Sequence, residues 1–332
     1  MTNMWLVQWL VRTIARRYAR RAVAKGGKTL DVVESMVRAD ATDLPSSSEV
    51  TDSIRRAPFL LRLGHRLAPT ELLDALRRGH YTALRKAEAP VWRSYRFRGH
   101  RVTHDIRHKC PWNAFVLGVH QPGVTHWLRE LSAPGACVLD IGANVGVLTL
   151  ELAEAVGPDG CVHAFEPNPE VLPQLRQSVD DNDLDHVVCV HAFALGTSDA
   201  TMTLAIPEVN NGAASLRQPR EGERNLSVEV RSFGDWWETQ GCPRVDCVKL
   251  DVEGYEETLI EALSPMLREC RPGLVMELSP DRYDAAALVE RLVAAGYRVM
   301  RVVEHPPFAV PLPEDLSRQM DIVCLPQSTT PA

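Results

Sequence analysis

Short apolar runs alternate with longer amphipathic stretches through the second half of the chain. The runs predict buried strands, and the stretches between them, whose apolar residues recur at helical spacing, predict helices. This alternation is typical of a parallel sheet with helices on both faces. We expect one strand ending at Asp140 and others at 161–165, 187–191, 245–250, 273–277, 297–303 and 320–325, with helices from Val147 and at 169–181, 255–263 and 283–295. The last strand follows a Pro-rich loop instead of a helix, so we expect an antiparallel final pair.

Two segments do not follow this alternation of strands and helices: one precedes the core strands and the other is inserted between two of them. Residues 201–206 and 226–231 alternate like an antiparallel pair and are joined by a loop at 210–216. Residues 95–106 alternate around Gly99, which predicts a short hairpin.

Residues 1–90 predict a helical appendage. An apolar run at 4–11, too short to span a bilayer, leads into a cluster of arginines at 12–21, and together they predict a basic amphipathic helix. We expect this helix to pack on its own protein, and contact with a membrane surface or a partner is the alternative. The expected organisation is the appendage at 1–90, an α/β domain at 91–326 and a tail at 327–332.

The central motif of the chain is a glycine turn between the first core strand and its helix. It contains Asp140, Gly142, Asn144 and Gly146. A phosphate-binding loop would close with Gly-Lys-Ser/Thr, and apolar residues stand there instead. A dinucleotide fingerprint would place a third glycine where Asn144 stands, so pyrophosphate binding is disfavoured.

An acidic residue, Glu166, ends the next predicted strand. It follows the turn at about the 20-residue distance at which a carboxylate meets a ribose diol. No Lys or Arg stands beside Asp140 or Glu166 in the sequence. A ligand with a ribose, a positive charge and no phosphate suits this pattern, and S-adenosylmethionine is such a ligand.

A second group of charged residues lies at the end of the predicted strand at 245–250. Lys249 and Asp251 are two residues apart and therefore point to the same face. An unpaired lysine in an apolar strand is costly, so a structural ion pair with Asp251 or Glu277 is one interpretation. The other places Lys249 and Asp251 at the carboxyl edge of the sheet, where they orient or deprotonate an acceptor.

Composition narrows the class of protein. The chain has 332 residues, a formal charge of -6 and 45% hydrophobic residues, which fits one or two soluble domains and argues against a broad nucleic-acid-binding surface. None of its eight cysteines forms a Cys-x-x-Cys pair, so we expect reduced, buried thiols, with Cys137, Cys161, Cys189 and Cys247 in core strands. No secretory signal is visible, and we expect a cytoplasmic protein. Histidines repeat at every fourth residue from His100 to His108, but the predicted strand there argues against a metal site.

Taken together, the motifs resemble the FkbM family of S-adenosylmethionine-dependent methyltransferases. The resemblance runs from about residue 112 to residue 325 and rests on the motifs at 138–146, 165–169, 194–196, 211–216 and 249–256. It implies the class I methyltransferase fold, a Rossmann-like, mostly parallel sheet of seven strands whose last strand is reversed. It also implies S-adenosylmethionine as cofactor and methylation of a hydroxyl on a sugar, polyketide or other small natural product.

Site residues follow from the matching motifs. The resemblance assigns cofactor binding to Asp140, Gly142, Ala143, Asn144, Gly146, Glu166, Pro167, Asn168, Ala194 and Asp251. We predict Asp251, Lys249 and Glu253 as the catalytic residues, and no metal, because no metal-ligand spacing in the sequence supports one. Placement adds His120, His126 and His191 as further candidates for the base, each with a structural role as the alternative. Where the family often has Tyr-Glu-Pro, this chain has His120-Gln121-Pro122, which indicates a different acceptor or cofactor lid.

Other functions stay open at this point. An amine or a carboxylate is the alternative methyl acceptor. A nicotinamide-dependent oxidoreductase shares the strand, turn and helix but would need the missing glycine. A non-catalytic module that binds a membrane or partner through the basic helix would not need Asp251. A homo-oligomer is compatible with the sequence, and we expect a small-molecule partner and no nucleic acid.

Overall fold

The computed structural model describes residues 81, 82, 84, 85, 87, 89–207, 214–216 and 220–327. The chain divides into two compact units, and the second comprises Arg93–His104 and His108–Ala332. The appendage expected at 1–90 lies almost wholly outside the described residues, as does nearly all of the tail, so these domain bounds stay a prediction. No helix among the described residues is long and apolar enough to cross a membrane.

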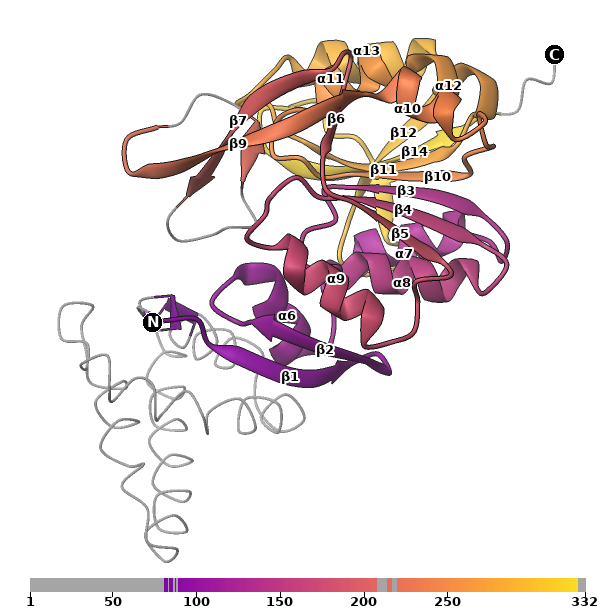
Figure 1. Ribbon diagram of the computed structural model, residues 1–332. Helices are drawn as coiled ribbons and strands as arrows, with labels where there is room; N and C mark the ends of the chain where they lie inside the picture. The colour runs from indigo at the N-terminus through magenta and orange to yellow at the C-terminus, as the bar shows by residue number, and fades with distance from the viewer. Residues whose placement is uncertain are drawn as a thin grey trace, which may run out of the picture. The chain divides into compact units, whose positions relative to one another are not determined.

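An eight-stranded sheet forms the centre of the second unit (Figure 1). Its strands, in spatial order, are β13 (Ala309–Pro311), β12 (Tyr297–Val302), β14 (Met320–Pro326), β11 (Gly273–Leu278), β10 (Cys247–Leu250), β3 (Cys137–Ile141), β4 (Cys161–Phe165) and β5 (Val188–His191). The neighbours from β11 to β5 pair in parallel, whereas β14 runs antiparallel to both β11 and β12. All seven predicted strands are present, and the reversed last strand confirms the class I methyltransferase fold.

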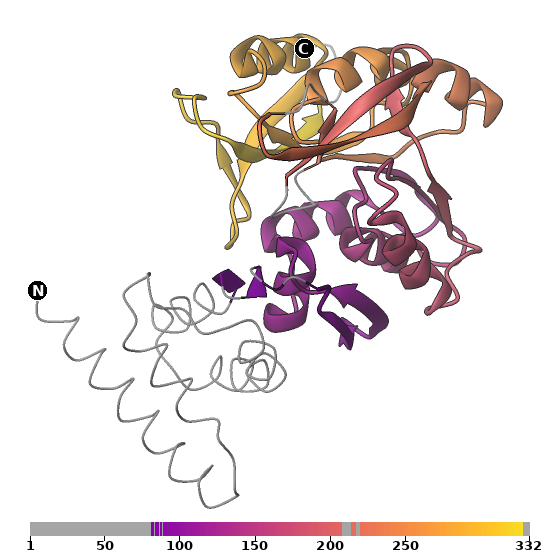
Figure 2. The same ribbon diagram turned by 60° about the vertical axis from the view of Figure 1, so that its left-hand side comes forward.

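Successive residues of these strands point to opposite faces of the sheet, so each strand contributes to two apolar layers. Val138 packs on one face with helices α7 (Pro122–Leu131), α8 (Val147–Val156) and α9 (Leu172–Asp180). Leu139 packs on the other with α10 (Phe233–Thr239), α11 (Glu256–Ala262), α12 (Ser264–Cys270) and α13 (Ala285–Ala294). Figure 2 shows the two helical layers on opposite sides of the sheet. This burial on both faces explains why the strand sequences are almost continuously apolar.

A second, four-stranded sheet arises from the predicted insertion. Its order is β6 (Ala194–Gly196), β9 (Glu223–Ser232), β7 (Ala200–Pro207) and β8 (Ser215–Leu216). The predicted antiparallel pair is β7 with β9 and is confirmed. The parallel pairing of β6 with β9 is not visible in the sequence, because β6 is too short to carry a pattern.

The predicted hairpin is also confirmed, as β1 (Trp92–Phe97) and β2 (His100–Asp105), with α6 (Lys109–Leu117) after it. Arg98 and Gly99 both have positive φ, 47° and 98°, as a two-residue hairpin turn demands. In β2 the buried His104 bonds Ser178 Oγ through Nε2, at 2.9 Å, and contacts the Tyr95 hydroxyl through Nδ1. These bonds give His104 a packing role.

Five elements were not predicted from the sequence: the short strands β6 and β8 of the inserted sheet, the helices α10 and α12, and the strand β13. The helices α10 and α12 have only seven residues each, and β13 has three, so none carries enough periodicity to be recognised. The predicted helix at 283–295 is α13, which begins at Ala285 because the Asp284 side chain caps it by accepting from the Ala287 N–H at 3.0 Å.

Candidate active site

A pocket opens at the carboxyl ends of β3, β4 and β10, where open α/β sheets bind their ligands. It encloses about 860 Å³, counting the solvent at its mouth. Nine of the residues predicted for the site line it: Gly142, Ala143, Asn144, Glu166, Pro167, Ala194, Lys249, Asp251 and Glu253. The structure therefore gathers in one place side chains that are more than a hundred residues apart.

The glycine turn directly contacts the end of β10. Gly142 has a φ of 84°, and a Cβ atom there would lie 2.0 Å from the carbonyl oxygen of Asp251. The Asp251 N–H in turn donates to the Ile141 carbonyl at 3.1 Å. Only glycine fits this contact, and it fixes Asp251 against the turn. The turn continues through Asn144, which also has positive φ, at 52°.

Lys249 pairs with Asp140, not with Asp251 or Glu277 as the sequence suggested. Its Nζ lies 3.1 Å from Asp140 Oδ1, and both side chains are buried. The parallel register of β10 and β3 places Lys249 beside Asp140, which explains the pairing. Asp140 Oδ2 accepts a second bond from the Thr149 hydroxyl at 2.6 Å. Asp140 is thus buried and does not line the pocket, and its predicted role in cofactor binding stays a prediction.

Lys249 also forms a hydrogen bond with the glycine turn. Lys249 Nζ donates to the Gly142 carbonyl at 2.8 Å. Burial opposes the charge of Lys249, but the nearby carboxylates of Asp140 and Asp251 outweigh it and raise its pKa. The lysine therefore stays charged and is unsuited to act as a base. It is the only Lys or Arg that lines the pocket among the described residues.

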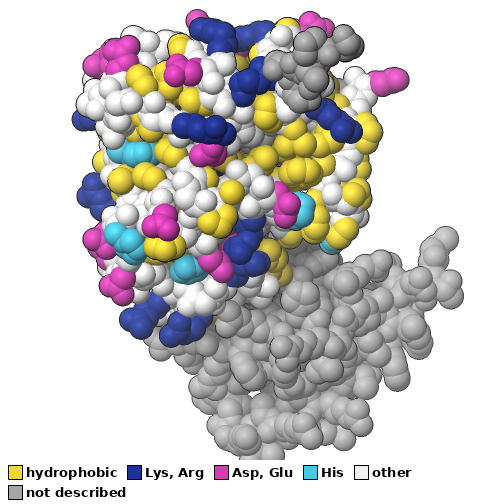
Figure 3. All heavy atoms as spheres, turned by 90° about the vertical axis from the view of Figure 1, so that its right-hand side faces the viewer, with side chains coloured by type: hydrophobic (Ala, Val, Ile, Leu, Met, Phe, Trp, Pro, Cys, Tyr) yellow, Lys and Arg dark blue, Asp and Glu magenta, His cyan; other side chains and the backbone are white. Residues whose placement is uncertain are grey.

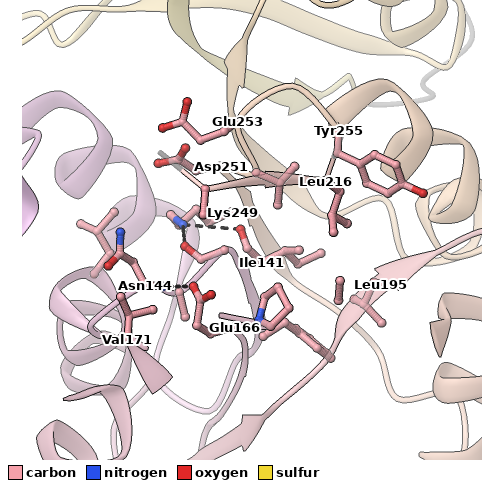
Figure 4. A pocket seen from close by; sticks show the side chains of 18 of the residues that line it. Ile141, Asn144, Glu166, Val171, Leu195, Leu216, Lys249, Asp251, Glu253 and Tyr255 are labelled. Atoms are coloured by element: carbon pink, nitrogen blue, oxygen red, sulfur yellow. Dashed lines mark hydrogen bonds between the residues drawn. The ribbon is translucent and has the colours of Figure 1, made fainter. Parts of the chain in front are cut away.

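Glu166 lies on the opposite side of the pocket from Asp251 and Glu253 (Figure 4). Its two carboxylate oxygens accept from the backbone N–H groups of Asn144 and Asn168, each at 2.8 Å. Burial raises its pKa to about 7, and the two N–H donors partly offset that effect. The turn thus orients a carboxylate that still lines the cavity and can accept from further hydroxyl groups.

Three carboxylates gather at the other side of the pocket. One oxygen each from Asp251, Glu253 and Glu277 lies within 4.8 Å of the others, a set that could hold a divalent cation. Burial, together with the charges of Asp251 and Glu256, raises the pKa of Glu253 to about 7. Burial and the charge of Asp251 raise the pKa of Glu277 to about 9. Near neutral pH, Glu253 therefore shifts readily between its charged and neutral forms.

The chain holds Glu253 in an unusual backbone conformation. Its φ is 55°, which only a small fraction of non-glycine residues adopt. The Ser215 hydroxyl donates to the Glu253 carbonyl at 2.6 Å, which ties the β8 segment to this position. Most of the predicted loop at 210–216 lies outside the described residues, but Ala214 and Leu216 line the pocket.

Of the three histidines proposed as bases, His120 alone reaches this pocket. Its Nδ1 is buried and has no hydrogen-bond partner among the described residues. Burial, with the charges of Lys109 and Lys249, lowers its pKa to about 3, so the imidazole is neutral and can accept a hydrogen bond. His126 stacks on Phe308 and His191 stacks on Phe165, and neither lines the pocket.

Two further predicted contacts lie just outside the pocket lining. Gly146 has positive φ and faces Leu175, and Asn168 is buried beneath Glu166. Both support the turn. Cys110, from α6, is a lining residue that the sequence did not single out, because no motif surrounds it.

Comparison with known proteins gives a family match. Residues 140–299 match the family model of the methyltransferase FkbM domain. "Methyltransferase 1" of Beauveria bassiana (strain ARSEF 2860) is 25% identical over 193 residues, which cover 52% of this chain and 76% of that protein.

Two solved structures are also similar. Methyltransferase FkbM from Methylobacillus flagellatus KT is 14% identical, with a TM-score of 0.37, over 82% of this chain and 60% of that one. The O-methyltransferase TomG from Streptomyces achromogenes, solved in complex with SAM, is 15% identical, with a TM-score of 0.37, over 62% of this chain and 79% of that one.

Proposed function

Because this chain belongs to the FkbM family of S-adenosylmethionine-dependent methyltransferases, we propose that it methylates a hydroxyl group of a small molecule. The observation that carries the proposal is Glu253, a pocket-lining carboxyl group whose pKa burial and neighbouring charges raise to about 7. A hydroxyl must lose its proton on methylation, and a general base works best when its pKa is near the working pH. An unprotonated amine acceptor would not need such a base.

The pocket fits S-adenosylmethionine on the side of the glycine turn. Gly142 and Asn144 bring backbone close to the cavity, and Glu166 offers carboxylate oxygens for the ribose hydroxyls. Lys249 is already paired with Asp140, so the described lining presents no unpaired Lys or Arg for a phosphate. When bound, the cofactor supplies an electrophilic methyl group on a positively charged sulfur.

The residues of the chain would then position the acceptor and take its proton. Asp251 stands at the end of β10, held by Gly142, where its negative charge would face the sulfonium and orient the acceptor. Glu253 would accept the hydroxyl proton, and a positioned general base contributes ~100- to 10,000-fold to rate. His120 offers a neutral nitrogen to the acceptor from across the pocket.

The first experiment is calorimetric titration of the purified protein with S-adenosylmethionine, with NADH as the control ligand. We expect S-adenosylmethionine alone to bind. Glu166→Ala should weaken this binding by about tenfold or more, because one lost hydrogen bond to a charged group accounts for ~1.5–3 kcal/mol. Acceptor binding should change much less.

A matched control is Asp159→Asn, an exposed acid in the loop before β4, at the opposite end of that strand. It should bind both ligands normally. Equal losses for cofactor and acceptor in Glu166→Ala would contradict the ribose role. Methylation of amines in preference to alcohols, unaffected by Glu253→Gln, would overturn the proposed hydroxyl acceptor.

A further inference from the structure

A group of thiols and imidazoles lies on β3, β4 and β5, outside the lining of the pocket described above. Cys161, His163 and Cys189 each offer one ligand atom, and these atoms all lie within 4.8 Å of one another. The Cys137 thiol interacts with that of Cys161 and is a fourth candidate, although its sulfur is not among the three atoms that are mutually within 4.8 Å. All eight cysteines are free, as expected, but the expected burial is wrong for three of this group's members: Cys189 is exposed, and Cys137 and Cys161 are half-buried.

Strand register assembles the group. Cys137 lies beside Cys161 in the pairing of β3 with β4, and His163 lies beside Cys189 in the pairing of β4 with β5. Residues two apart on one strand share a face, so the four side chains project from the same side of the sheet. The edge position of β5 explains why Cys189 reaches solvent.

The spacing of the ligand atoms suits a tetrahedral ion. Cys161 Sγ lies 3.4 Å from His163 Nε2. Bond lengths of ~2.3 Å for Zn–S and ~2.0–2.1 Å for Zn–N place these two atoms about 3.6 Å apart around tetrahedral zinc. The Cys189 sulfur lies within 4.8 Å of both of these atoms.

The imidazole of His163 is already oriented for this role. Its Nδ1 lies 3.1 Å from His191 Nε2. If Nδ1 carries the proton and donates it to His191, Nε2 presents its lone pair toward the two sulfurs, the arrangement usual for metal-bound histidine. His191 is itself held by stacking on Phe165, with ring centroids 4.5 Å apart.

We propose that Cys137, Cys161, His163 and Cys189 form a zinc-binding site that ties together β3, β4 and the edge strand β5. Three sulfurs and one imidazole nitrogen match the composition of structural zinc sites, which use four protein ligands and leave no open position. The site is separate from the methyl-transfer pocket, so its presence does not depend on the proposed acceptor.

The test uses the full-length protein, reduced and freed of metal, titrated with Co²⁺ and then with Zn²⁺. We expect one Co²⁺ per chain to give the intense visible and near-ultraviolet absorption of a tetrahedral thiolate site and to be displaced by Zn²⁺. Zn²⁺ should also raise the thermal midpoint. Cys161→Ser and the exposed Cys189→Ser should each lose the spectrum, and His191→Phe should weaken binding by ~10- to 100-fold, as removal of an outer-shell partner does.

The control is Cys242→Ser, an exposed free cysteine that belongs to no candidate group of ligands among the described residues. It should keep the Co²⁺ spectrum. The proposal is overturned if the folded, reduced protein binds no Co²⁺ or Zn²⁺, or if the spectrum survives in both Cys161→Ser and Cys189→Ser. Binding of S-adenosylmethionine, measured in parallel, should be the same whether or not the protein binds the metal.

Discussion

The pocket and the thiol group occupy the same sheet but are built in different ways. In the pocket, groups meet because chain reversals bring them together: the turn at Gly142 touches Asp251, and Glu253 sits in a left-handed backbone. In the thiol group, side chains meet because strand register aligns Cys161 and His163 with their neighbours. The first arrangement therefore depends on backbone shape, whereas the second depends on which side chains share a face.

Figure 3 shows basic and acidic side chains interspersed on one face, without a continuous field of one sign. The described part of this face thus offers no broad basic track of the kind that nucleic-acid binding uses. Both candidate sites are therefore identified from residues on the strands and turns of the sheet, not from a pattern of surface charge.

The largest expected effect comes from removing the carboxylate that the turn positions. Asp251→Ala should reduce methyl transfer by roughly 100-fold or more, because the carboxylate that would face the sulfonium and orient the acceptor is lost. Initial rates with an acceptor that the unaltered protein methylates measure the loss, and circular dichroism checks that the fold survives. Near-normal turnover would remove Asp251 from the mechanism, and Asp159→Asn provides the matched reference.

The next effect concerns the ion pair beneath the turn. Lys249→Met leaves Asp140 buried without its partner, and such a loss destabilises a protein by about 3–5 kcal/mol. Urea denaturation measures the free energy of unfolding. Lys249→Met combined with Asp140→Asn should recover much of the loss, because no unpaired charge then remains. A double variant as unstable as the single one would show that Lys249 acts through packing instead.

A smaller effect distinguishes the two carboxyl groups whose pKa values are raised to about 7. Glu253 must lose its proton to act as a base, so kcat at saturating S-adenosylmethionine should rise with pH and level off above about 7. Glu253→Gln should remove this rising limb. Glu166, whose pKa is also about 7, should affect cofactor affinity instead. A rising limb that persists in Glu253→Gln would assign the base elsewhere, with His120 excluded if its pKa stays near 3.

The same shift predicts how Glu253 affects stability. Its pKa is raised from 4.5 to about 7, so the folded protein binds more protons than the unfolded chain between these values. The contribution of this group to the free energy of unfolding therefore falls as pH rises through that window. Glu253→Gln should flatten this part of the stability profile, which the same urea series measures at several pH values.

Much of the fold could be predicted because its signals are local. Apolar runs and helical periodicity located all seven core strands, and the Pro-rich loop before β14 predicted its reversal. The alternation at 201–206 and 226–231 identified the inserted pair, and the positive φ at Gly99 fits the predicted hairpin. Elements as short as β6, β8 and β13 carry too few residues for such a signal.

The motifs of the sequence by themselves indicated the resemblance to the FkbM family, the sheet and nine of the residues that line the pocket, because each motif spans one strand end or one turn. Only the tertiary structure decided the partner of Lys249, since the choice between Asp140 and Asp251 depends on the register of β10 against β3. It also showed that Asp140 is buried outside the pocket lining, and it brought Cys161 and Cys189 together, with Cys137 beside Cys161. Contacts between strands depend on how whole strands align, and no local stretch of sequence encodes that alignment.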